Sequence, residues 1–241
     1  MLLIPKIIHQ IWSGIEEPLP SHFKKFGDTW KLYHPEWQYE LWDNRRMNDF
    51  VQTHYPQYWD TYCRFPYNIQ RWDSIRYLIL EKIGGVYADF DIECFKPLDD
   101  LWEDKQCCFS LEPSVHAFRS RRSFLFNNAL MASIPNHRFM KAVIDVTFQD
   151  ELIMLKKMQI SQKENVIMYT TGPIMLVDLY RNYPDKESIY LIPENYTSPL
   201  TREECLQYLR ENRPEYLQKK LKDAYALHYF FNTWIPKLYY S

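Results

Sequence analysis

The chain of 241 residues is predicted to be an α/β protein, one domain built on a mixed, mainly parallel sheet. Apolar segments of strand length alternate with segments of helical periodicity, which is typical of helices packed on a parallel sheet. The sequence shows no internal repeat and no linker, and its 46% hydrophobic residues are sufficient for one sizeable core. We therefore expect residues 1–241 to fold as a single domain.

The N-terminal part is predicted to contain two strands and two helices. A strand over residues 6–12 precedes a helix that ends before Pro35, because proline cannot continue a helix. Alternation of apolar and polar residues predicts a second strand over residues 37–42. A second helix is then expected to end before Pro56.

The strongest helical pattern covers residues 67–83. Its apolar residues recur at helical spacing, and Gly84 and Gly85 follow at the position where a left-handed residue ends a helix. A strand of alternating character is predicted immediately afterwards, over residues 86–92.

The rest of the chain is predicted to continue the alternation of strands and helices. Thr201 and Glu204 have the spacing of a capping box at the start of a helix. The expected strands cover residues 106–111, 124–127, 189–192 and 224–230, and the expected helices cover residues 136–159 and begin near residues 173 and 201.

The composition argues against several classes of protein. The net charge of −2 disfavours a general electrostatic grip on nucleic acid, which requires a basic surface. No apolar run has the length of a signal peptide or of a membrane span. The five cysteines include no CxxC and cannot all pair internally, which indicates reduced thiols. We therefore expect a cytoplasmic protein, with peripheral contact at the inner face of the cell membrane as an open alternative.

The glycine pattern bears on phosphate binding. Only five glycines are present, and none forms a GxGxxG or GxxxxGK[ST] loop that binds phosphates through its backbone. If this protein binds a nucleotide diphosphate, a divalent metal held by carboxylates is the usual substitute.

Asp89 and Asp91 are the first candidates for such a metal site. In a strand, residues two apart point to the same face, so both carboxylates would face one way while Phe90 faces the core. Paired carboxylates suit Mg²⁺ or Mn²⁺ that bridges a diphosphate. The alternative is a pair of solvated acidic residues at the edge of a strand.

Asp73 and Arg76 lie three apart on the predicted helix and therefore share a face. They form an ordinary helix ion pair, or Asp73 binds a sugar or ribose hydroxyl while Arg76 contacts phosphate or sugar. The helix leads through the two glycines into the strand of Asp89, so both pairs of residues can meet at one cleft.

The segment 71–91, RWDSIRYLILEKIGGVYADFD, resembles the signature of glycosyltransferase family 32 and is similar to the catalytic domain of the clostridial glucosylating toxins. The pattern there is S-D-x-x-R-x-x-x-L followed by G-G-x-Y-x-D-x-D, and Trp72 replaces the small residue before Asp73. Other motifs of the family are matched by IPKIIHQIW at residues 4–12, TGP at residues 171–173 and HYFFNTW at residues 228–234.

The resemblance implies a GT-A fold, which is a Rossmann-like nucleotide-sugar-binding domain, and a transfer of a hexose with retention of configuration. It implies a UDP- or GDP-sugar as donor and Mn²⁺ or Mg²⁺ as cofactor. The implied acceptor is a glycan or a lipid-linked saccharide, in surface polysaccharide synthesis such as capsule formation. Enzymes of this type have no agreed nucleophile, and the residues of this chain indicate none.

The resemblance also implies roles for single residues. Catalytic roles are expected for Asp73, Arg76, Asp89 and Asp91. Contacts with the donor are expected for Ile11, Trp12, Asp73, Arg76, Tyr77, Gly85, Asp89, Thr233 and Trp234. The acceptor side is expected at Asn127, Thr171 and Gly172, and the metal ligands are expected among Asp89, Asp91, His228 and Asn232. Trp12 would stack on the base of the donor, and Thr233 stands where the family usually has serine.

Two other functions are compatible with parts of the sequence. Phosphohydrolases of the haloacid-dehalogenase type also carry Asp-x-Asp after a strand, and the first Asp is the nucleophile. Their motif normally opens the domain and continues with Gly-Thr, whereas Ile92 and Glu93 follow Asp91 here. A non-catalytic sugar-binding protein is the third alternative.

Three weaker features concern the acceptor. The RSRR segment at residues 119–122 would bind an anionic lipid-linked acceptor or form a solvated loop. The lysines within residues 219–222 would support a weak contact with a membrane surface. Asn127 and Asn128 stand where the end of a strand can face the acceptor, although turn chemistry explains them equally well.

Overall fold

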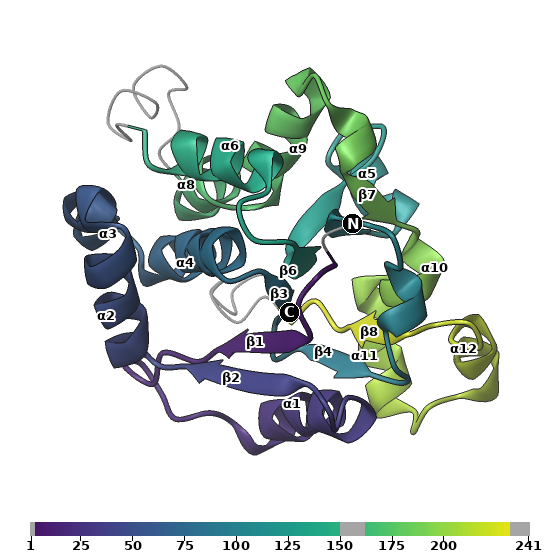
Figure 1. The fold of residues 1–241 in the computed structure, drawn as a ribbon. Helices are drawn as coiled ribbons and strands as arrows, with labels where there is room; N and C mark the ends of the chain where they lie inside the picture. The colour runs from purple at the N-terminus through teal and green to yellow at the C-terminus, as the bar shows by residue number, and fades with distance from the viewer. Residues whose placement is uncertain (1–2, 150–161, 232–241) are drawn as a thin grey trace.

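Figure 1 shows the fold of the computed structural model, which describes residues 3–149 and 162–231. The expected alternation of strands and helices is confirmed in these residues. The strands are β1 (Ile7–Ile11), β2 (Gln38–Trp42), β3 (Gly85–Ala88), β4 (Ile92–Cys94), β5 (Cys107–Leu111), β6 (Phe126–Ser133), β7 (Tyr190–Ile192) and β8 (Ala226–His228). The helices are α1 (Ser21–Tyr33), α2 (Asn44–His54), α3 (Trp59–Arg64), α4 (Asn68–Lys82), α5 (Ser114–Arg119), α6 (Arg138–Thr147), α8 (Lys163–Thr170), α9 (Pro173–Asn182), α10 (Glu194–Thr197), α11 (Arg202–Arg210) and α12 (Glu215–Lys220). Short 3-10 turns are η1 (Pro56–Tyr58), η2 (Asp99–Leu101) and η3 (Lys186–Ser188).

The central sheet is mixed and mainly parallel, as expected. Its strands have the order β2-β1-β3-β6-β5-β7, and β6 is antiparallel to both of its neighbours while the other pairs are parallel. The carboxyl ends of the parallel strands therefore lie at the same edge as the amino end of β6. A separate two-stranded antiparallel sheet joins β4 to β8.

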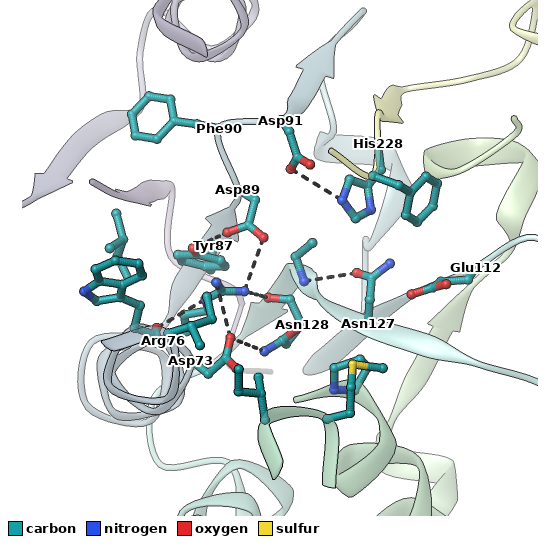
Figure 2. A pocket seen from close by; sticks show the side chains of 18 of the residues that line it. Asp73, Arg76, Tyr87, Asp89, Phe90, Asp91, Glu112, Asn127, Asn128 and His228 are labelled. Atoms are coloured by element: carbon teal, nitrogen blue, oxygen red, sulfur yellow. Dashed lines mark hydrogen bonds and ion pairs between the residues drawn. The ribbon is translucent and has the colours of Figure 1, made fainter. Parts of the chain in front are cut away.

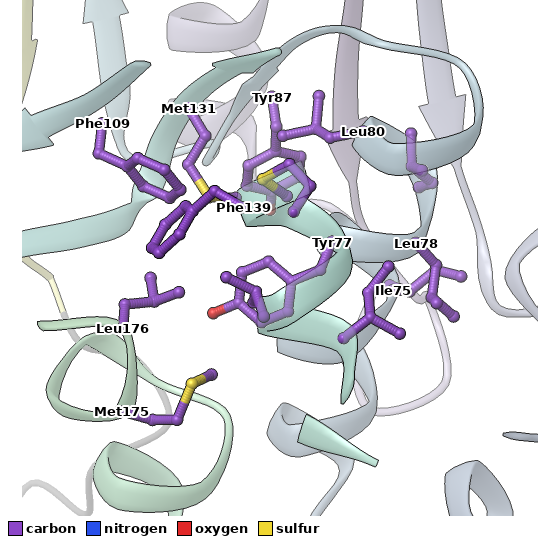
Figure 3. Close-up of a cluster of buried hydrophobic side chains, with 14 of the residues drawn as sticks. Ile75, Tyr77, Leu78, Leu80, Tyr87, Phe109, Met131, Phe139, Met175 and Leu176 are labelled. Atoms are coloured by element: carbon purple, nitrogen blue, oxygen red, sulfur yellow. The ribbon is translucent and has the colours of Figure 1, made fainter. Parts of the chain in front are cut away.

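Successive side chains of the sheet enter two different hydrophobic clusters. On β3, Tyr87 belongs to one cluster, whereas Val86 and Ala88 belong to the other. Helices α2, α4, α6 and α9 supply the first cluster, part of which Figure 3 shows. Helix α1 supplies the second, where the fully buried Trp30 donates a hydrogen bond to the Ile92 carbonyl at 2.9 Å. The sheet is thus buried on both faces, as expected for an α/β fold.

Helix α4 confirms the helix predicted over residues 67–83. Gly84 and Gly85 follow it with φ of +74° and +99°, a conformation that a residue with a side chain adopts rarely. A Cβ atom on Gly85 would lie 2.6 Å from the carbonyl oxygen of Ile7. Glycine therefore lets β3 start close beside β1.

The strand predicted over residues 86–92 is wrong in its second half. Strand β3 ends at Ala88, and the chain makes a turn through Asp89, Phe90 and Asp91 before β4 begins at Ile92. The reason is a long-range pairing, because β4 leaves the central sheet and pairs with β8.

Several other boundaries also differ from the prediction, and of the strand expected over residues 224–230 only Ala226–His228 forms β8. Strand β6 extends to Ser133, well beyond the predicted residues 124–127, because a strand buried between two neighbours does not depend on β-propensity alone. Helix α6 ends at Thr147 and so falls short of the predicted end at residue 159, while residues 150–161 lie outside the described part of the chain. Helix α8 was not predicted.

Helix α11 confirms the predicted capping box. The Glu204 N–H donates to Thr201 Oγ1 at 3.2 Å, and the Thr201 N–H donates to Glu204 Oε2 at 2.9 Å. Across the described residues, no helix combines the length and the apolar character that crossing a membrane requires.

Candidate active site

A pocket of about 540 Å³ opens at the edge of the sheet where the parallel strands end. Trp12 follows β1 and Asp89 follows β3, so both stand at carboxyl ends of strands, where ligands of α/β proteins usually bind. Because β6 runs in the opposite direction, its amino end brings Asn127 and Asn128 to the same edge. His228, the last residue of β8, adds to the lining.

Arg76 is the centre of a buried polar network in this pocket (Figure 2). Its guanidinium lies 3.3 Å from the Asp73 carboxylate and 3.3 Å from the Asp89 carboxylate. It also donates to the backbone carbonyl of Asn128 at 3.0 Å and lies 4.9 Å from the centre of the Tyr87 ring. The ion pair expected between Asp73 and Arg76 is present, and Arg76 extends it to Asp89.

Asp73 is almost completely buried, and both of its oxygens accept hydrogen bonds. Oδ1 accepts from Asn128 Nδ2 at 2.9 Å, and Oδ2 accepts from Thr171 Oγ1 at 3.0 Å. Burial raises the pKa of Asp73 to about 6, against the opposing effect of Arg76 and of these donors. Asp73 therefore holds Arg76 and Asn128 in place, and it also lines the pocket.

Asp89 is held by the same network. It lies in the turn after β3, where its Oδ1 accepts from the Tyr87 hydroxyl at 2.5 Å and its Oδ2 accepts from Arg76 at 3.3 Å. Burial raises the pKa of Asp89, although the positive charge of Arg76 opposes this effect. Both oxygens of Asp89 are thus engaged inside the protein.

Asp91 has different partners, which come from β8 and the residues after it. Its Oδ1 lies 3.4 Å from His228 Nε2, and its Oδ2 accepts the backbone N–H of Phe231 at 3.0 Å. Burial acts to raise the pKa of Asp91, but His228, the Phe231 N–H and Arg76 together outweigh it, so the pKa is lowered. Burial acts to lower the pKa of His228, but Asp91, together with the charges of Asp89 and Glu112, outweighs it, so that pKa is raised. His228 Nδ1 is buried without a hydrogen-bond partner among the described residues.

Asp91 and His228 are the residues best placed to hold a metal ion. Within residues 3–149 and 162–231, no group of three or more His, Cys, Asp or Glu is arranged to hold one. Mg²⁺ usually takes one or two protein carboxylates and completes its shell with substrate phosphates and water. Asp91 with His228 beside it fits that kind of site. Asp89 is less suitable as a direct ligand, because Tyr87 and Arg76 already donate to its oxygens.

Trp12 is half-buried and lines the pocket beside Ile11. Its ring centre lies 5.6 Å from that of Phe23 and 6.1 Å from that of Phe90, and its Nε1 donates to the Glu17 carbonyl at 2.9 Å. These contacts hold the indole while part of it faces the pocket, which suits stacking on a base. Phe90 was expected to face the core. It is buried, but it packs against Trp12 and lines the pocket.

Four predicted ligand-binding residues lie behind the pocket lining and support it. The Tyr77 hydroxyl donates to the Thr171 carbonyl at 2.6 Å and accepts from Asn128 Nδ2 at 3.0 Å. Gly85 lets β3 approach β1, and Gly172 is the N-cap of α9. None of Tyr77, Gly85, Thr171 and Gly172 lines the pocket, so the structure gives them supporting positions behind it. The predicted residues Asn232, Thr233 and Trp234 lie outside the described residues.

The pocket also contains side chains whose role no sequence pattern predicted. Glu112 lies just after β5 and His116 lies on α5, and both line the pocket. The sequence suggested Asn128, with Asn127, for the acceptor side or for a turn, but its amide donates to Asp73, because neighbours in a strand point to opposite sides. The role of Tyr87 could have been predicted, because it lies two residues before Asp89 on the strand that leads to Asp89. No such signal exists for Glu112 or His116.

The sequence is similar to known glycosyltransferases. Residues 20–108 match the glycosyltransferase sugar-binding region containing the DXD motif. The chain is 34% identical over 197 residues to the mannosyl phosphorylinositol ceramide synthase SUR1 of Saccharomyces cerevisiae, covering 81% of this chain and 45% of that protein. It is 30% identical over 205 residues to the inositol phosphoceramide mannosyltransferase 3 of Schizosaccharomyces pombe, covering 80% and 51%. The chain thus spans about half the length of these curated relatives.

The fold has relatives among solved structures. The UDP-bound glycosyltransferase domain of the YGT toxin superposes with a TM-score of 0.55 at 10% identity, over 91% of this chain and 90% of that domain. At this identity the likeness concerns the fold alone, and it agrees with the expected GT-A fold. The family match spans the helix of Asp73 and Arg76 and the turn of Asp89 and Asp91. The chain therefore belongs to the glycosyltransferases that carry the DXD-containing sugar-binding region.

Proposed function

We propose that this protein transfers a hexose, with mannose as the first candidate, from a nucleotide-sugar donor to a lipid with an inositol phosphate head group. The observation that carries the proposal is the pocket that brings Trp12, Arg76, Asp91 and His228 together. The names of the two fungal relatives support mannose and inositol phosphoceramide. They replace the expectation of a surface polysaccharide or capsule, which finds no support in these relatives.

The donor would lie across the ends of β1 and β3. Trp12 would contact the base, while Asp91 and His228 would hold Mn²⁺ or Mg²⁺ beside the diphosphate. A bound divalent cation would supply positive charge that stabilises the leaving nucleoside diphosphate. Asp89, which Arg76 and Tyr87 hold in place, would accept a hydrogen bond from a ribose or sugar hydroxyl.

Retention of configuration is part of this proposal and rests on the resemblance to family 32. Asp73 and Asp89 are each bound to Arg76, which does not suit either carboxylate as a nucleophile. A nuclear magnetic resonance spectrum of the first product would distinguish the α-linked product of retention from the β-linked product of inversion.

The phosphohydrolase alternative has less support than sugar transfer. It requires Asp89 to attack phosphorus with a free oxygen, but Tyr87 and Arg76 donate to its two oxygens. The family membership also favours sugar transfer. The experiment described next distinguishes a non-catalytic sugar-binding function from sugar transfer.

The first experiment is a thermal-shift panel with GDP-mannose, UDP-glucose and UDP-galactose, each with Mn²⁺ and with EDTA. The proposal expects a stabilisation that requires the metal and is specific for one nucleotide. Transfer to phosphatidylinositol in detergent micelles is then measured with that donor. Binding without any transfer or donor hydrolysis would favour the sugar-binding alternative, and no binding would contradict the proposed donor site. Peripheral membrane contact belongs to the same proposal, and the cytoplasmic location stays a prediction.

A further inference from the structure

One end of the pocket carries polar side chains for which the donor site described above has no use. Glu112 and Asn127 line this end, and Arg119, which also lines the pocket, ends α5, the helix whose His116 pairs with Glu112. Figure 2 shows Phe90, which packs on Trp12, and Glu112 on opposite sides of Asp89 and Asp91. If the nucleotide lies at Trp12, the end at Glu112 remains for the acceptor.

Asn127 has a buried hydrogen-bond donor that the protein leaves unused. Its side-chain oxygen Oδ1 accepts hydrogen bonds from the backbone N–H groups of Ala129 at 3.0 Å and of Leu130 at 3.4 Å. These two donors fix the orientation of the amide, so Nδ2 must be the atom on the other side. Asn127 is 3% exposed, and its Nδ2 has no partner among the described residues. A buried N–H without an acceptor is costly, which indicates that a ligand supplies one.

Glu112 offers an acceptor at the same end of the pocket. Its Oε2 lies 3.0 Å from His116 Nδ1, while His116 Nε2 faces the backbone N–H of Arg202 at 3.4 Å. Because Nε2 accepts that N–H, Nδ1 of a neutral His116 carries the proton and donates to Glu112. His116 thereby fixes the carboxylate, and no described residue donates to its other oxygen, Oε1. Glu112 is also nearly buried, with a side chain 11% exposed.

From this geometry we infer that Glu112 and Asn127 form the binding site for the acceptor polyol. A hydroxyl group can both donate and accept, so neighbouring hydroxyls of one ring can donate to Glu112 Oε1 and accept from Asn127 Nδ2. Arg119 also lines the pocket, and its Nη1 donates to Glu203 at 2.6 Å. The other N–H groups of its guanidinium, in a side chain 57% exposed, suit a phosphate on the same ring that stays near the solvent. The ligand class is therefore a polyol phosphate. This inference rests on the proposed function, because it takes the end at Trp12 to be the donor site.

Two nearly isosteric substitutions test the site. Asn127→Asp keeps an oxygen for the two backbone N–H groups and replaces the donor Nδ2 by an acceptor. Glu112→Gln keeps the size of the side chain and removes its charge. The control is Glu215→Gln, because Glu215 pairs with Lys219 at 3.0 Å on α12, has a side chain 83% exposed and does not line the pocket.

The first measurement is calorimetric binding of myo-inositol 1-phosphate to the protein with nucleotide bound, which requires no turnover. We expect each pocket variant to weaken binding about tenfold or more, because each loses one hydrogen bond to a charged or buried partner. The control should change the affinity little. Unchanged affinity in both pocket variants would overturn the inference, and so would wild-type protein that binds neither this probe nor phosphatidylinositol in micelles. Binding of the lipid but not of the soluble phosphate would identify the source as a lipid head group.

The second measurement separates this inference from the proposed function. Hydrolysis of the donor by water uses the donor site alone, so both pocket variants should retain it. Transfer to the polyol should show a KM for the acceptor raised about tenfold, with a smaller change in kcat. Wild-type protein that binds the polyol but neither hydrolyses nor transfers would contradict the proposed function while supporting the binding site. Loss of donor hydrolysis in both pocket variants would instead overturn their assignment to the acceptor.

Discussion

The charged and amide side chains on the two sides of the pocket differ in how completely they are paired. On the side of α4, which we call the paired side, the carboxylates and the guanidinium contact one another or a hydrogen-bond donor. The paired side consists of Asp73, Arg76, Tyr87, Asp89 and Asn128. Each of these groups is fixed by the protein itself before a ligand arrives, as preorganisation requires.

The opposite side, which we call the open side, contains polar atoms that the described residues leave without partners. These atoms are Asn127 Nδ2 and His228 Nδ1. The open side consists of Asp91, Glu112, Asn127 and His228. Since buried polar groups are normally paired, the contrast indicates that packing completes one side and that ligands complete the other.

The largest effect is expected on the paired side, for Arg76→Met. This change leaves the buried carboxylates of Asp73 and Asp89 without their common cation. Breaking a buried ion pair typically costs about 3–5 kcal/mol, so the free energy of unfolding should fall by about that amount. Urea denaturation at neutral pH measures it.

The matched control for Arg76→Met is Arg122→Met. Arg122 pairs with Asp178 at 2.5 Å, but the Asp178 side chain is 44% exposed. Such a partly solvated pair contributes about 0–1 kcal/mol, so the control should lose much less stability. Equal losses in the two variants would mean that the ion pairs of Arg76 stabilise the protein no more than a partly exposed ion pair does.

On the open side, Asp91→Asn should mainly affect activity. Asparagine can still accept the Phe231 N–H, so the protein should stay folded, but the negative charge that would hold the cation is lost. Removing charge stabilisation from a reacting group typically costs about 100- to 1,000-fold in rate, and we expect that loss in metal-dependent donor hydrolysis. Asp89→Asn is the comparison, and it should lower the melting temperature more than Asp91→Asn does. A near-normal rate in Asp91→Asn would remove Asp91 from the metal site.

The contrast between the sides also explains what the sequence could predict about the fold and the site. Asp73, Arg76 and Asp89 lie within one continuous stretch, which runs from helix α4 through two glycines and β3 to Asp89 just after it, so local periodicity places them together. The turn at Asp89 and the partners of Asp91 depend on the pairing of β4 with β8, which no local pattern reveals. The role of Glu112 depends on the pairing of β5 with β6, which brings the end of β5 beside Phe126 and Asn127. Long-range pairing therefore limits the prediction mainly on the open side.

Trp12→Ala should weaken nucleotide binding without a comparable loss of stability. Trp12 lies outside both sides, at the end of the pocket where the base is proposed to stack. Loss of stacking on an aromatic ring typically costs about 1–3 kcal/mol, which is the expected fall in the affinity for the nucleotide. Trp12→Phe keeps an aromatic face and should retain most of the affinity in a calorimetric titration. If both variants bind the nucleotide like the wild type, Trp12 serves only to pack on Phe23 and Phe90.

The smallest effect is a difference in how the two sides respond to pH. Burial raises the pKa of Asp73 to about 6, so the folded protein binds this proton more tightly than the unfolded chain does. As the pH rises from about 4 to 6, the unfolded chain releases the proton first, and this group lowers the free energy of unfolding by about 1 kcal/mol per pH unit. Asp73→Asn should remove the Asp73 part of that slope in urea denaturation, while Asp89, whose pKa burial also raises, still contributes in the same direction. Asp91→Asn should not, because the lowered pKa of Asp91 gives a contribution of opposite sign, lost only as the pH falls through its folded pKa. A slope that is undiminished in Asp73→Asn would show that this carboxyl does not make the paired side sensitive to pH.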